Sequence, residues 1–311
     1  MESHAIVINE PKKVQLSKLQ IDVLSQGDVA VEMEYSGIST GTEKMIWSGT
    51  MPMFPGMGYP LVPGYESVGH ITHASQDSPL KVGQRVFVPG AKCYGDVKGL
   101  FGGAASHVVI PHQRLTAIDD DLGKEAILLA LAATAYHVTE GQESAQPDLI
   151  VGHGVVGRLL ARIAVLKGKT PVVWEVNPTR MAGALNYKVV HPKDDDCHQY
   201  GVICDASGDA SLINQLISRL RPQGEIVLAG FYDQAISYQF APAFMREMKM
   251  RIAAQWQTKD IEEVHQLIRS KQLSLDGLIT NTSNPQDAVT AYQTAFNDMQ
   301  CLKMTLNWRT A

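Results

Sequence analysis

Tyr65 and Glu66 follow a Pro-Gly turn in the stretch PLVPGYESVGH, which spans residues 60–70. The turn places both side chains at the start of an apolar strand that the sequence predicts from Ser67 to Ile71. Places where a turn meets a sheet often carry binding and catalytic groups. A phenol and a carboxylate at such a place can exchange a proton with a substrate. The alternative is a solvent-exposed Tyr-Glu pair on an ordinary strand.

A second group of residues has the spacing of a phosphate-binding loop. Gly152, Gly154 and Gly157 form GHGVVG directly after a predicted strand and at the head of a predicted helix. The first glycine permits a tight turn, the second lets the backbone approach a pyrophosphate, and the third lets the helix pack on the strand. The helix N-terminus would then face the phosphate charge. The sequence therefore predicts a dinucleotide-binding site.

Glu175 indicates which dinucleotide the loop binds. It ends the next predicted strand, VVWE, eighteen residues beyond Gly157, where an acidic side chain accepts hydrogen bonds from the adenosine ribose hydroxyls. Its charge would repel a 2′-phosphate, so NAD is favoured over NADP. Arg180 follows this strand and would weaken that preference if it reached the ribose. The alternative is that Arg180 is a solvated helix residue.

Composition limits the class of protein. The chain has 311 residues, of which 45% are hydrophobic and 19% charged, and its formal net charge is −5. These values are typical of a globular protein of two domains. The absence of long Lys/Arg runs argues against nucleic-acid binding, and no apolar stretch has the length of a membrane span. The N-terminus lacks the order of a signal peptide, so we expect a cytoplasmic protein.

The first part of the chain, up to about residue 120, has short apolar alternations interrupted by Gly and Pro, as in GDVAVEMEYSGI and GQRVFVPG. This pattern predicts a small β-rich barrel or sandwich. From DDLGKEAILLALAATAYHVTEG onward the period becomes helical. One face of that helix carries Ala126, Leu129, Ala130, Ala133 and His137.

Strands and helices then alternate, which predicts an α/β fold with a doubly wound parallel sheet. The predicted strands are PDLIVGHG, TPVVWEVN, YGVICDASG and GEIVLAGFY. The predicted helices are VVGRLLARIAVLKG and ASLINQLISRLRPQ, and a further helix is predicted to start in PTRMAGALN. The tail DAVTAYQTAFNDMQCLKMTLNW reads as a helix and a strand that could return to the first domain.

A first β-rich domain, a dinucleotide domain and a C-terminal return together resemble the medium-chain dehydrogenase/reductase superfamily over nearly the whole chain. The local matches are GDVAVEMEYSGIS, LVPGYESVG, VGQRVFV, ATAYH, VGHGVVG and LRPQGEIVLAGFY. The resemblance implies a GroES-like β-barrel-type catalytic domain, residues 1–125 completed by 270–311, and a Rossmann NAD-binding domain, residues 126–269. It places Thr134 near the nicotinamide. The predicted cofactor site also includes Val155, Val156, Asn177, Ala206, Ser207, Gly230 and Phe231.

The resemblance also bears on metal binding. Zinc-dependent members carry ligands at three positions that are occupied here by Ser39, Tyr65 and Ala130. Neutral hydroxyls and a methyl group do not make a zinc site, because zinc at neutral pH requires thiolate, imidazole or carboxylate. The structural zinc lobe of those members is represented only by GAKCYGDVKG with Cys93, and the four cysteines of the chain show no C-x-x-C spacing. We therefore expect a metal-free member.

A closer resemblance is to the enzymes of bacteriochlorophyll synthesis that oxidise the 3-(1-hydroxyethyl) group of a chlorophyllide or bacteriochlorophyllide to 3-acetyl with NAD. It is carried by SGISTGTEKMIWSGTMPMFPGMGYPLVPGYESVG, PDLIVGHGVVGRLLAR and VVWEVNPTR. The resemblance implies a magnesium tetrapyrrole as substrate, and Met and aromatic side chains suit a flat macrocycle. The expected contacts are Met45, Trp47, Met51, Met53, Phe54, Met57 and Tyr59. Alternatively, these residues pack the loop onto the barrel or form a contact in a homodimer.

Without a metal, the protein must supply a base and hydrogen-bond partners for the developing alkoxide. The candidates are Tyr65, Glu66, Ser39, Thr42, Glu43 and His137. Tyr65 stands at a zinc-ligand position of the superfamily, and ISTGTE supplies the opposing wall. His137 could relay a proton to solvent, although a packed helix histidine is the alternative. The base is thus one of several residues.

Two other functions remain open. A zinc-free quinone or enoyl reductase shares the fold but normally uses NADPH, which Glu175 disfavours. A non-catalytic pigment carrier would not need the intact glycine loop.

Overall fold

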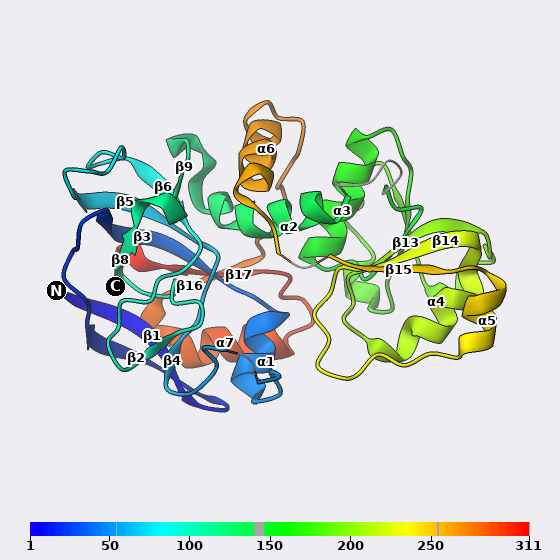
Figure 1. Ribbon diagram of the computed structural model, residues 1–311, viewed down its shortest axis with the longest axis horizontal. Helices are drawn as coiled ribbons and strands as arrows, with labels where there is room; N and C mark the ends of the chain where they lie inside the picture. The colour runs from blue at the N-terminus through cyan, green and yellow to red at the C-terminus, as the bar shows by residue number, and fades with distance from the viewer. Residues whose placement is uncertain (54, 140–145, 254, 311) are drawn as a thin grey trace. The chain divides into compact units, whose positions relative to one another are not determined.

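The computed structural model describes residues 1–53, 55–139, 146–253 and 255–310. The chain divides into two compact units. Unit 1 comprises Met1–Ala130 and Leu278–Ala311, and unit 2 comprises Leu131–Gly277. Both chain termini lie in unit 1 (Figure 1).

The smaller sheet of unit 1 has four strands in the order β2-β1-β4-β7. These strands are β1 (Glu2–Glu10), β2 (Lys13–Gln20), β4 (Leu61–Val62) and β7 (Lys98–Gly99). β1 and β2 form an antiparallel hairpin. Lys12 in its turn has a φ of 66°, a left-handed conformation that tight hairpins require.

The larger sheet of unit 1 has seven strands in the order β16-β17-β3-β5-β6-β9, and β8 also pairs with β3. The strands are β3 (Asp28–Ile38), β5 (Ser67–Ala74), β6 (Arg85–Val88), β8 (His107–Pro111), β9 (Thr116–Ala117), β16 (Asn281–Ser283) and β17 (Met304–Asn307). β17 pairs antiparallel with the end of β3, from Met304 opposite Ile38 to Asn307 opposite Tyr35. The C-terminal segment therefore completes the sheet of unit 1.

One hydrophobic core joins both sheets of unit 1 to the helix α7 (Ala288–Asn297). Tyr292 and Phe296 of α7 are buried in this core, and α7 packs beside β2 (Figure 1). The other α-helix that lies wholly in unit 1 is α1 (Thr42–Ser48). The short 3-10 helices of this unit are η1 (His112–Arg114), η2 (Asp120–Leu128), η6 (Pro285–Asp287) and η7 (Trp308–Thr310).

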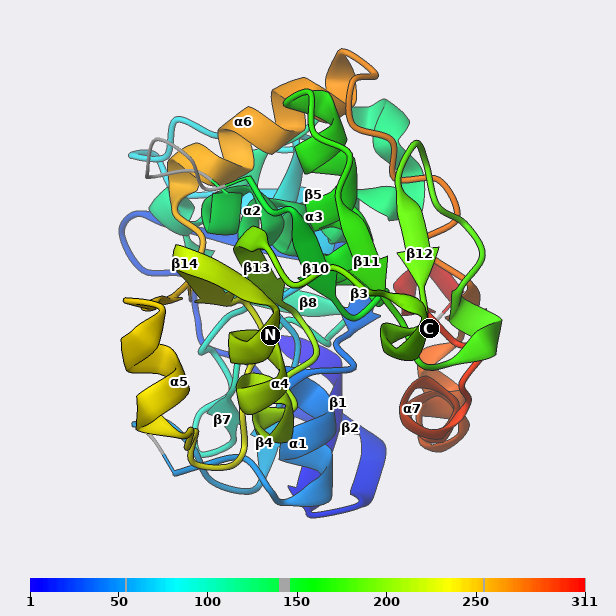
Figure 2. The same cartoon turned by 90° about the vertical axis from the view of Figure 1, so that its right-hand side faces the viewer.

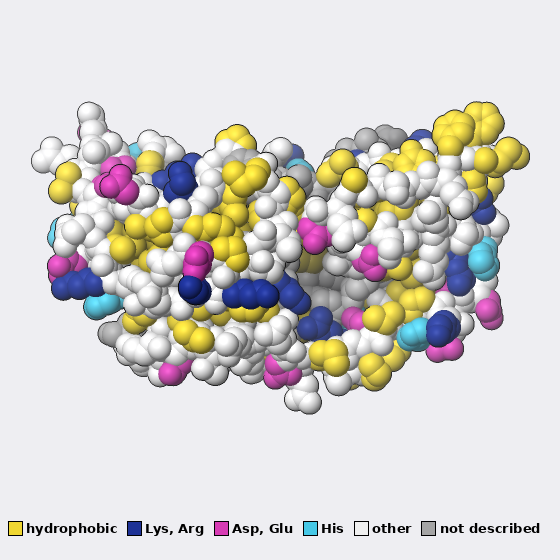
Figure 3. Space-filling view, turned by 90° about the horizontal axis from the view of Figure 1, so that it is seen from below, with side chains coloured by type: hydrophobic (Ala, Val, Ile, Leu, Met, Phe, Trp, Pro, Cys, Tyr) yellow, Lys and Arg dark blue, Asp and Glu magenta, His cyan; other side chains and the backbone are white. Residues whose placement is uncertain are grey.

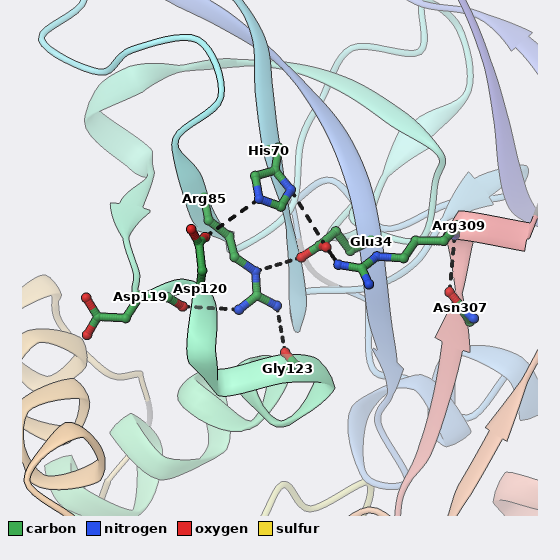
Figure 4. Close-up of polar contacts among 8 residues, drawn as sticks. All are labelled: Glu34, His70, Arg85, Asp119, Asp120, Gly123, Asn307 and Arg309. Carbon is green, nitrogen blue, oxygen red and sulfur yellow. Dashed lines mark hydrogen bonds and ion pairs between the residues drawn. The ribbon is translucent and has the colours of Figure 1, made fainter.

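The first unit extends to Ala130, five residues beyond the bound predicted from the sequence, because η2 packs against β3 and β5. Arg85 of β6 holds the start of η2 against the sheet. The buried guanidinium of Arg85 donates to Glu34 Oε2 (2.6 Å), Asp119 O (3.1 Å) and Gly123 O (2.6 Å). Figure 4 shows these contacts around Arg85. At the other bound, Arg162 donates to Ser274 O (2.7 Å) and Asp276 O (2.9 Å), so this segment stays with unit 2 beyond the predicted residue 269.

Unit 2 is a six-stranded parallel sheet in the order β12-β11-β10-β13-β14-β15. The strands are β10 (Leu149–Val151), β11 (Val172–Trp174), β12 (Lys188–Val190), β13 (Tyr200–Asp205), β14 (Leu220–Leu228) and β15 (Lys249–Ile252). The order reverses between β10 and β13, where doubly wound sheets bind ligands at the carboxyl ends of their strands. The predicted α/β fold class is confirmed.

Helices cover both faces of this sheet, with α3 (Val155–Leu166) on one face and α4 (Ile213–Arg219) on the other (Figure 2). The remaining helices are α2 (Leu129–Thr139), α5 (Phe240–Met245), α6 (Thr258–Arg269) and the 3-10 helices η3 (Pro178–Arg180), η4 (Pro192–Asp194) and η5 (Ala210–Leu212). The helix predicted for PTRMAGALN is wrong beyond its first turn. Arg158 of α3 donates to the carbonyls of Arg180, Ala182 and Gly183, which are the acceptors that a helix would use for itself.

An apolar surface patch lies at the α5 end of unit 2 (Figure 3). Phe240, Phe244 and Met245 of α5 are 71%, 65% and 75% exposed, and Ile252 of the edge strand β15 is 75% exposed. The rings of Phe240 and Phe244 adjoin each other, with 5.5 Å between their centroids. Within the described residues, no helix is both long and apolar enough to span a membrane.

Candidate active site

The hydroxyls of Ser39 and Tyr65 form a pair in unit 1, 2.8 Å apart. Ser39 follows the end of β3, and Tyr65 lies two residues before β5 begins at Ser67. These strands pair antiparallel with Ser36 opposite Ser67, so the end of one lies beside the start of the other. Tyr65 is half-buried, and Phe101 packs edge-on against its ring, with 5.3 Å between centroids.

Glu66 is fully buried, so the solvent-exposed alternative for the Tyr-Glu pair is wrong. Its Oε2 forms an ion pair with the ammonium of Lys303, which is 1% exposed. Lys303 Nζ also donates to Ile38 O at 3.1 Å. A Cβ on Gly37 would lie 2.8 Å from Glu66 Oε2 and 3.0 Å from Lys303 Cε, so this glycine makes room for the ion pair.

Glu43 is a second fully buried carboxyl beside this pair. Its Oε1 accepts the Ser39 N–H at 3.3 Å, and its Oε2 accepts the Tyr292 hydroxyl at 3.0 Å. Burial, and then the charge of Glu66, raise the pKa of Glu43 to about 8, while Lys303 opposes the shift. At neutral pH most Glu43 side chains therefore keep their proton.

Burial also raises the pKa values of Tyr65 and Glu66. The charge of Glu66 adds to the shift of Tyr65, whereas Lys303 and the Tyr65 hydroxyl lower the pKa of Glu66 and offset part of its burial. A carboxylate with a raised pKa is a better proton acceptor near neutral pH. The cluster can thus pass a proton between its hydroxyls and two carboxyls that water does not reach.

Zinc takes thiolate, imidazole or carboxylate ligands. Ser39 and Tyr65 carry hydroxyls, and the raised pKa of Tyr65 keeps its phenol protonated. Ala130 has only a methyl side chain. The adjacent carboxylate, Glu66, is paired with Lys303. Across the described residues, no group of three or more His, Cys, Asp or Glu side chains is arranged to hold a metal ion.

Lys303 and Tyr292 belong to this cluster but were not predicted from the sequence. The available signal for Lys303 was a single charged residue within the apolar run CLKMTLNW, because lysines are almost never fully buried unless they are paired. Nothing in the sequence indicates a role for Tyr292, since a single tyrosine in an amphipathic helix usually packs in the hydrophobic core.

The loop expected to contact substrate packs largely on the unit 1 core. Met51 is buried, Met45, Trp47, Met57 and Tyr59 pack against the core, and Met53 is 82% exposed. The Trp47 ring lies 5.4 Å from that of Phe296, and Tyr59 bonds to Ile46 O. Phe54 lies outside the described residues. The packing alternative therefore accounts for the buried members of this set.

The glycine loop of unit 2 has the geometry of a phosphate cradle. Gly152 has a φ of 96°, which favours glycine. A Cβ on Gly157 would lie 1.8 Å from Gly152 O, whereas a Cβ on Gly154 would meet nothing within 4 Å. The backbone is thus open at Gly154, which is the N-cap of α3, where helices bind phosphate.

Glu175 lies directly after β11 and is 8% exposed. Its Oε2 accepts the His153 N–H at 3.1 Å, and its Oε1 accepts the N–H groups of Val176 and Asn177, each at 2.8 Å. These bonds fix the carboxylate beside the glycine loop. The residues present therefore fit a dinucleotide, with the Glu175 carboxylate held beside the glycine loop.

His153 stabilises the segment that follows Glu175. Its ring is buried, with Nδ1 at 2.6 Å from Arg180 O and Nε2 at 2.8 Å from Tyr187 Oη. Burial lowers the pKa of His153 to about 4, so the ring is neutral at physiological pH. Arg158 Nε donates to His153 O at 3.1 Å. In the sequence, the only indication of this hydrogen-bond network is the histidine inside the glycine motif.

Other predicted cofactor residues lie at the carboxyl ends of β13 and β14. Asp205 fixes the first loop by accepting both the N–H and the hydroxyl of Ser207, at 2.8 and 2.6 Å. A Cβ on Gly230 would lie 2.7 Å from Gly208 N, so the two loops are in contact. Phe231 is 51% exposed. Half-buried members of the predicted set are Thr134, Val156, Asn177, Arg180 and Ala206, and Val155 is buried.

His137 belongs to α2 in unit 2, and its Nδ1 lies 2.9 Å from Asp260 Oδ2. Asp260 also accepts the Gln257 N–H at 2.7 Å, as part of the capping box of α6. The structure thus gives His137 a partner on α6.

Known proteins resemble this chain in sequence and in fold. The model of the alcohol dehydrogenase GroES-like domain matches residues 25–120. The chain is 50% identical over 313 residues to 2-desacetyl-2-hydroxyethyl bacteriochlorophyllide A dehydrogenase of Rhodobacter capsulatus, with 100% of both chains covered. It is 48% identical over 315 residues to the protein of the same name from Cereibacter sphaeroides, with 99% of each chain covered.

Solved structures share the fold at low sequence identity. A short chain alcohol dehydrogenase from Escherichia coli CFT073, crystallised with NADH, superposes with a TM-score of 0.83 at 20% identity, covering 98% of this chain and 99% of its own.

Proposed function

Since the chain belongs to the medium-chain alcohol dehydrogenase family, among the 2-desacetyl-2-hydroxyethyl bacteriochlorophyllide A dehydrogenases, we propose that it oxidises the hydroxyethyl group of a bacteriochlorophyllide or chlorophyllide to an acetyl group. The observation that carries the proposal is the Ser39–Tyr65 hydroxyl pair with Glu66 buried behind it. Such a pair can hold a secondary alcohol and take its proton. The reaction belongs to bacteriochlorophyll synthesis.

The proposed reaction converts a secondary alcohol and an oxidised dinucleotide into a ketone, a reduced dinucleotide and a proton. A nicotinamide dinucleotide held beside the glycine loop and Glu175 would supply the acceptor for the hydride of the carbinol carbon. The chain's own groups remove the hydroxyl proton, and Tyr65 is the group that we assign to the reacting oxygen. Because the raised pKa of Tyr65 keeps it protonated, the phenol acts as a relay that gives up one proton while receiving another.

The cofactor is a nicotinamide dinucleotide, and we propose that it is NAD. Glu175 supports this choice, because backbone N–H groups fix its carboxylate beside the glycine loop. A carboxylate there would repel a 2′-phosphate and accept hydrogen bonds from ribose hydroxyls. Arg180 directs its carbonyl to His153 and Arg158, and that anchoring ties its backbone to the glycine loop. Titration of the protein with NAD and with NADP tests whether Arg180 influences the choice between them.

We propose that the reaction does not require zinc. The support is the chemistry of the donors at Ser39, Tyr65 and Ala130, together with the pairing of Glu66 to Lys303. We also propose that the substrate contacts Met53 and the half-buried Met45, Trp47, Met57 and Tyr59. The proposed location is the cytoplasm. A homodimer is the candidate assembly, and the apolar patch around α5 is available for it.

The test is to incubate the purified protein with NAD and a 3-hydroxyethyl chlorophyllide. We expect absorption of NADH together with the shifted pigment band of an acetyl group conjugated to the ring. A sample without NAD and a sample with the 3-acetyl pigment are the controls. Pigment binding without turnover would instead identify a carrier, and reduction of quinones or enones with NADPH would identify the reductase alternative.

A further inference from the structure

Unit 1 contains two buried ion pairs that differ in how completely their polar atoms are bonded. The first is Arg85–Glu34, described above and drawn in Figure 4. All of its oxygens have cationic or donor neighbours, since Glu34 Oε1 also faces His70 Nδ1 at 3.7 Å and Arg309. A buried pair whose bonds are satisfied in this way holds strands together.

The second pair is Lys303–Glu66, and its bonding is incomplete. Within the part of the chain that the structure describes, no donor reaches Glu66 Oε1 with hydrogen-bond geometry, although the atom is buried. Its Oε2 has Lys303 as an ionic neighbour. A buried acceptor without a bond costs about 1–3 kcal/mol, and such atoms in native proteins often serve catalysis.

The titratable groups that face Glu66 come from four segments. They are Lys303 before β17, Tyr65 before β5, Glu43 on α1 and, behind Glu43, Tyr292 on α7. One ammonium among two carboxyls leaves the cluster neutral when Glu66 is ionised and Glu43 keeps its proton. The raised pKa of Glu43, about 8, agrees with that distribution.

We propose that Lys303 is a positioning residue of the reaction, whose ammonium holds Glu66 as the carboxylate that accepts the proton leaving the Ser39–Tyr65 hydroxyl pair. The inference rests on the proposed function, because it assigns the destination of the substrate's proton. As the carbinol C–H bond breaks and the hydride leaves for the dinucleotide, the substrate O–H proton moves to the Tyr65 oxygen. The Tyr65 proton moves to Glu66, and the C=O bond forms. One proton thus ends on Glu66 and later leaves to solvent.

The ammonium fits this task because Glu66 is out of contact with water. Without a buried cation, a fully desolvated carboxyl takes up a proton at neutral pH and accepts no further one. Lys303 opposes that effect of burial on Glu66. Because Lys303 is itself held by Ile38 O, the charge is fixed in place and does not follow the substrate.

The experiment compares Lys303→Met, Lys303→Arg and the double variant Lys303→Met/Glu66→Gln with the parent enzyme. We expect turnover by Lys303→Met to fall by about tenfold or more at pH 7, with the rising limb of its kcat-against-pH profile displaced to higher pH by about one unit or more. Lys303→Arg should keep the limb near that of the parent. The double variant removes both charges, so it should regain thermal stability without regaining turnover.

Arg85→Met is the matched control, because it removes the cation of the other buried pair in the same unit. We expect it to lower Tm and leave the rising limb in place. If Lys303→Met also lowers Tm without moving the limb, or if the double variant regains turnover, Lys303 is only structural and the proposal is wrong.

A measurement that does not depend on turnover tests the role of Lys303 separately from the proposed function. Infrared spectra of the purified proteins at pH 7 should show an additional protonated-carboxyl band in Lys303→Met that is missing from the double variant. If the parent fails to oxidise the hydroxyethyl pigment, the proposed function is wrong, yet this band still reports whether Lys303 keeps Glu66 ionised. An unchanged carboxyl region in Lys303→Met would overturn the charge assignment itself.

Discussion

At the scale of single residues, the site depends on hydroxyls and carboxyls whose protons are controlled by burial. Tyr65 and Ser39 are bonded to each other, and Glu43 and Glu66 are cut off from water. Lys303 is the adjacent buried cation. Each of these groups can be changed by one substitution that preserves its size.

Replacing Tyr65 by Phe should lower turnover of the hydroxyethyl substrate about a hundredfold, because a lost transition-state partner costs roughly 3 kcal/mol. The ring and its packing on Phe101 are retained, so Tm should change little. Steady-state kinetics and an NADH titration check this expectation, and the affinity for NADH should match that of the parent. Full activity of Tyr65→Phe, with loss of activity in Glu66→Gln, Glu43→Gln or His137→Ala, would move the first proton acceptor to one of those residues.

Glu43→Gln should change how stability depends on pH. The folded-state pKa of Glu43 is raised to about 8 from an ordinary value of 4.5, so between these values the folded chain holds a proton that the unfolded chain has released. The free energy of unfolding of the parent therefore falls as pH rises through this window, by at most about 1.4 kcal/mol per pH unit from this group. The variant lacks that contribution. Denaturant unfolding at pH 6, 7 and 8 should show Glu43→Gln gaining stability relative to the parent, and parallel curves would contradict the pKa.

Glu175→Ala should weaken NAD binding about tenfold or more and affect NADP less, because it removes bonds to the ribose and also a repulsion toward the 2′-phosphate. Titrations with both dinucleotides measure the ratio. The variant also loses three bonds to backbone N–H groups, so Glu175→Gln, whose amide oxygen can still accept from the N–H groups of Val176 and Asn177, is the control for loop disorder. An unaltered preference between NAD and NADP would show that this carboxylate does not face the ribose.

At the scale of elements, the stretch from the end of β3 to the start of α1 carries two of the proton-handling groups, Ser39 and Glu43. Gly37 lies in this stretch and leaves space for the Lys303–Glu66 pair. Gly41 lies four residues further on, and a Cβ there would meet nothing within 4 Å. The two glycines thus offer a comparison in which only one position is crowded.

Gly37→Ala should displace the ion pair, since the new methyl group overlaps Glu66 Oε2. Overpacking of this kind costs typically 1–3 kcal/mol, and we expect a lower Tm together with reduced turnover. Gly41→Ala is the matched control and should keep both close to the parent values. Thermal unfolding and kinetics of the two variants, side by side, test the argument, and equal behaviour would show that the neighbours of Gly37 adjust freely.

The features that could be predicted are those whose residues lie close together in the sequence. The glycine loop and Glu175 lie within one strand-helix-strand unit, so their spacing alone specified both. The helix expected after Asn177 was wrong, because Arg158 takes the carbonyls that it needed and no local pattern reveals a side chain arriving from α3. Lys303 and Tyr292 could not be assigned either, since they lie 265 and 249 positions from the groups they contact, Ile38 and Glu43.

At the scale of the whole molecule, we expect activity without a metal ion. Elemental analysis of the purified protein should find far less than one zinc atom per chain, and incubation with a chelator should leave the rate unchanged, because the hydroxyl and methyl side chains at Ser39, Tyr65 and Ala130 are poor zinc ligands. Chelation of a zinc-dependent alcohol dehydrogenase in parallel is the control. Loss of activity that added zinc restores would overturn the expectation.

The pairing of β17 with β3 also has a consequence for biosynthesis. A ribosome produces the first 130 residues of unit 1 early, but their sheet stays open until the last segment, Leu278–Ala311, has been made. Unit 2 is continuous in sequence and can fold while translation continues, in keeping with domains folding as units. Lys303 is therefore added to the site only as synthesis ends, and a chain terminated prematurely near residue 277 would keep its nucleotide-binding sheet while lacking the cation beside Glu66.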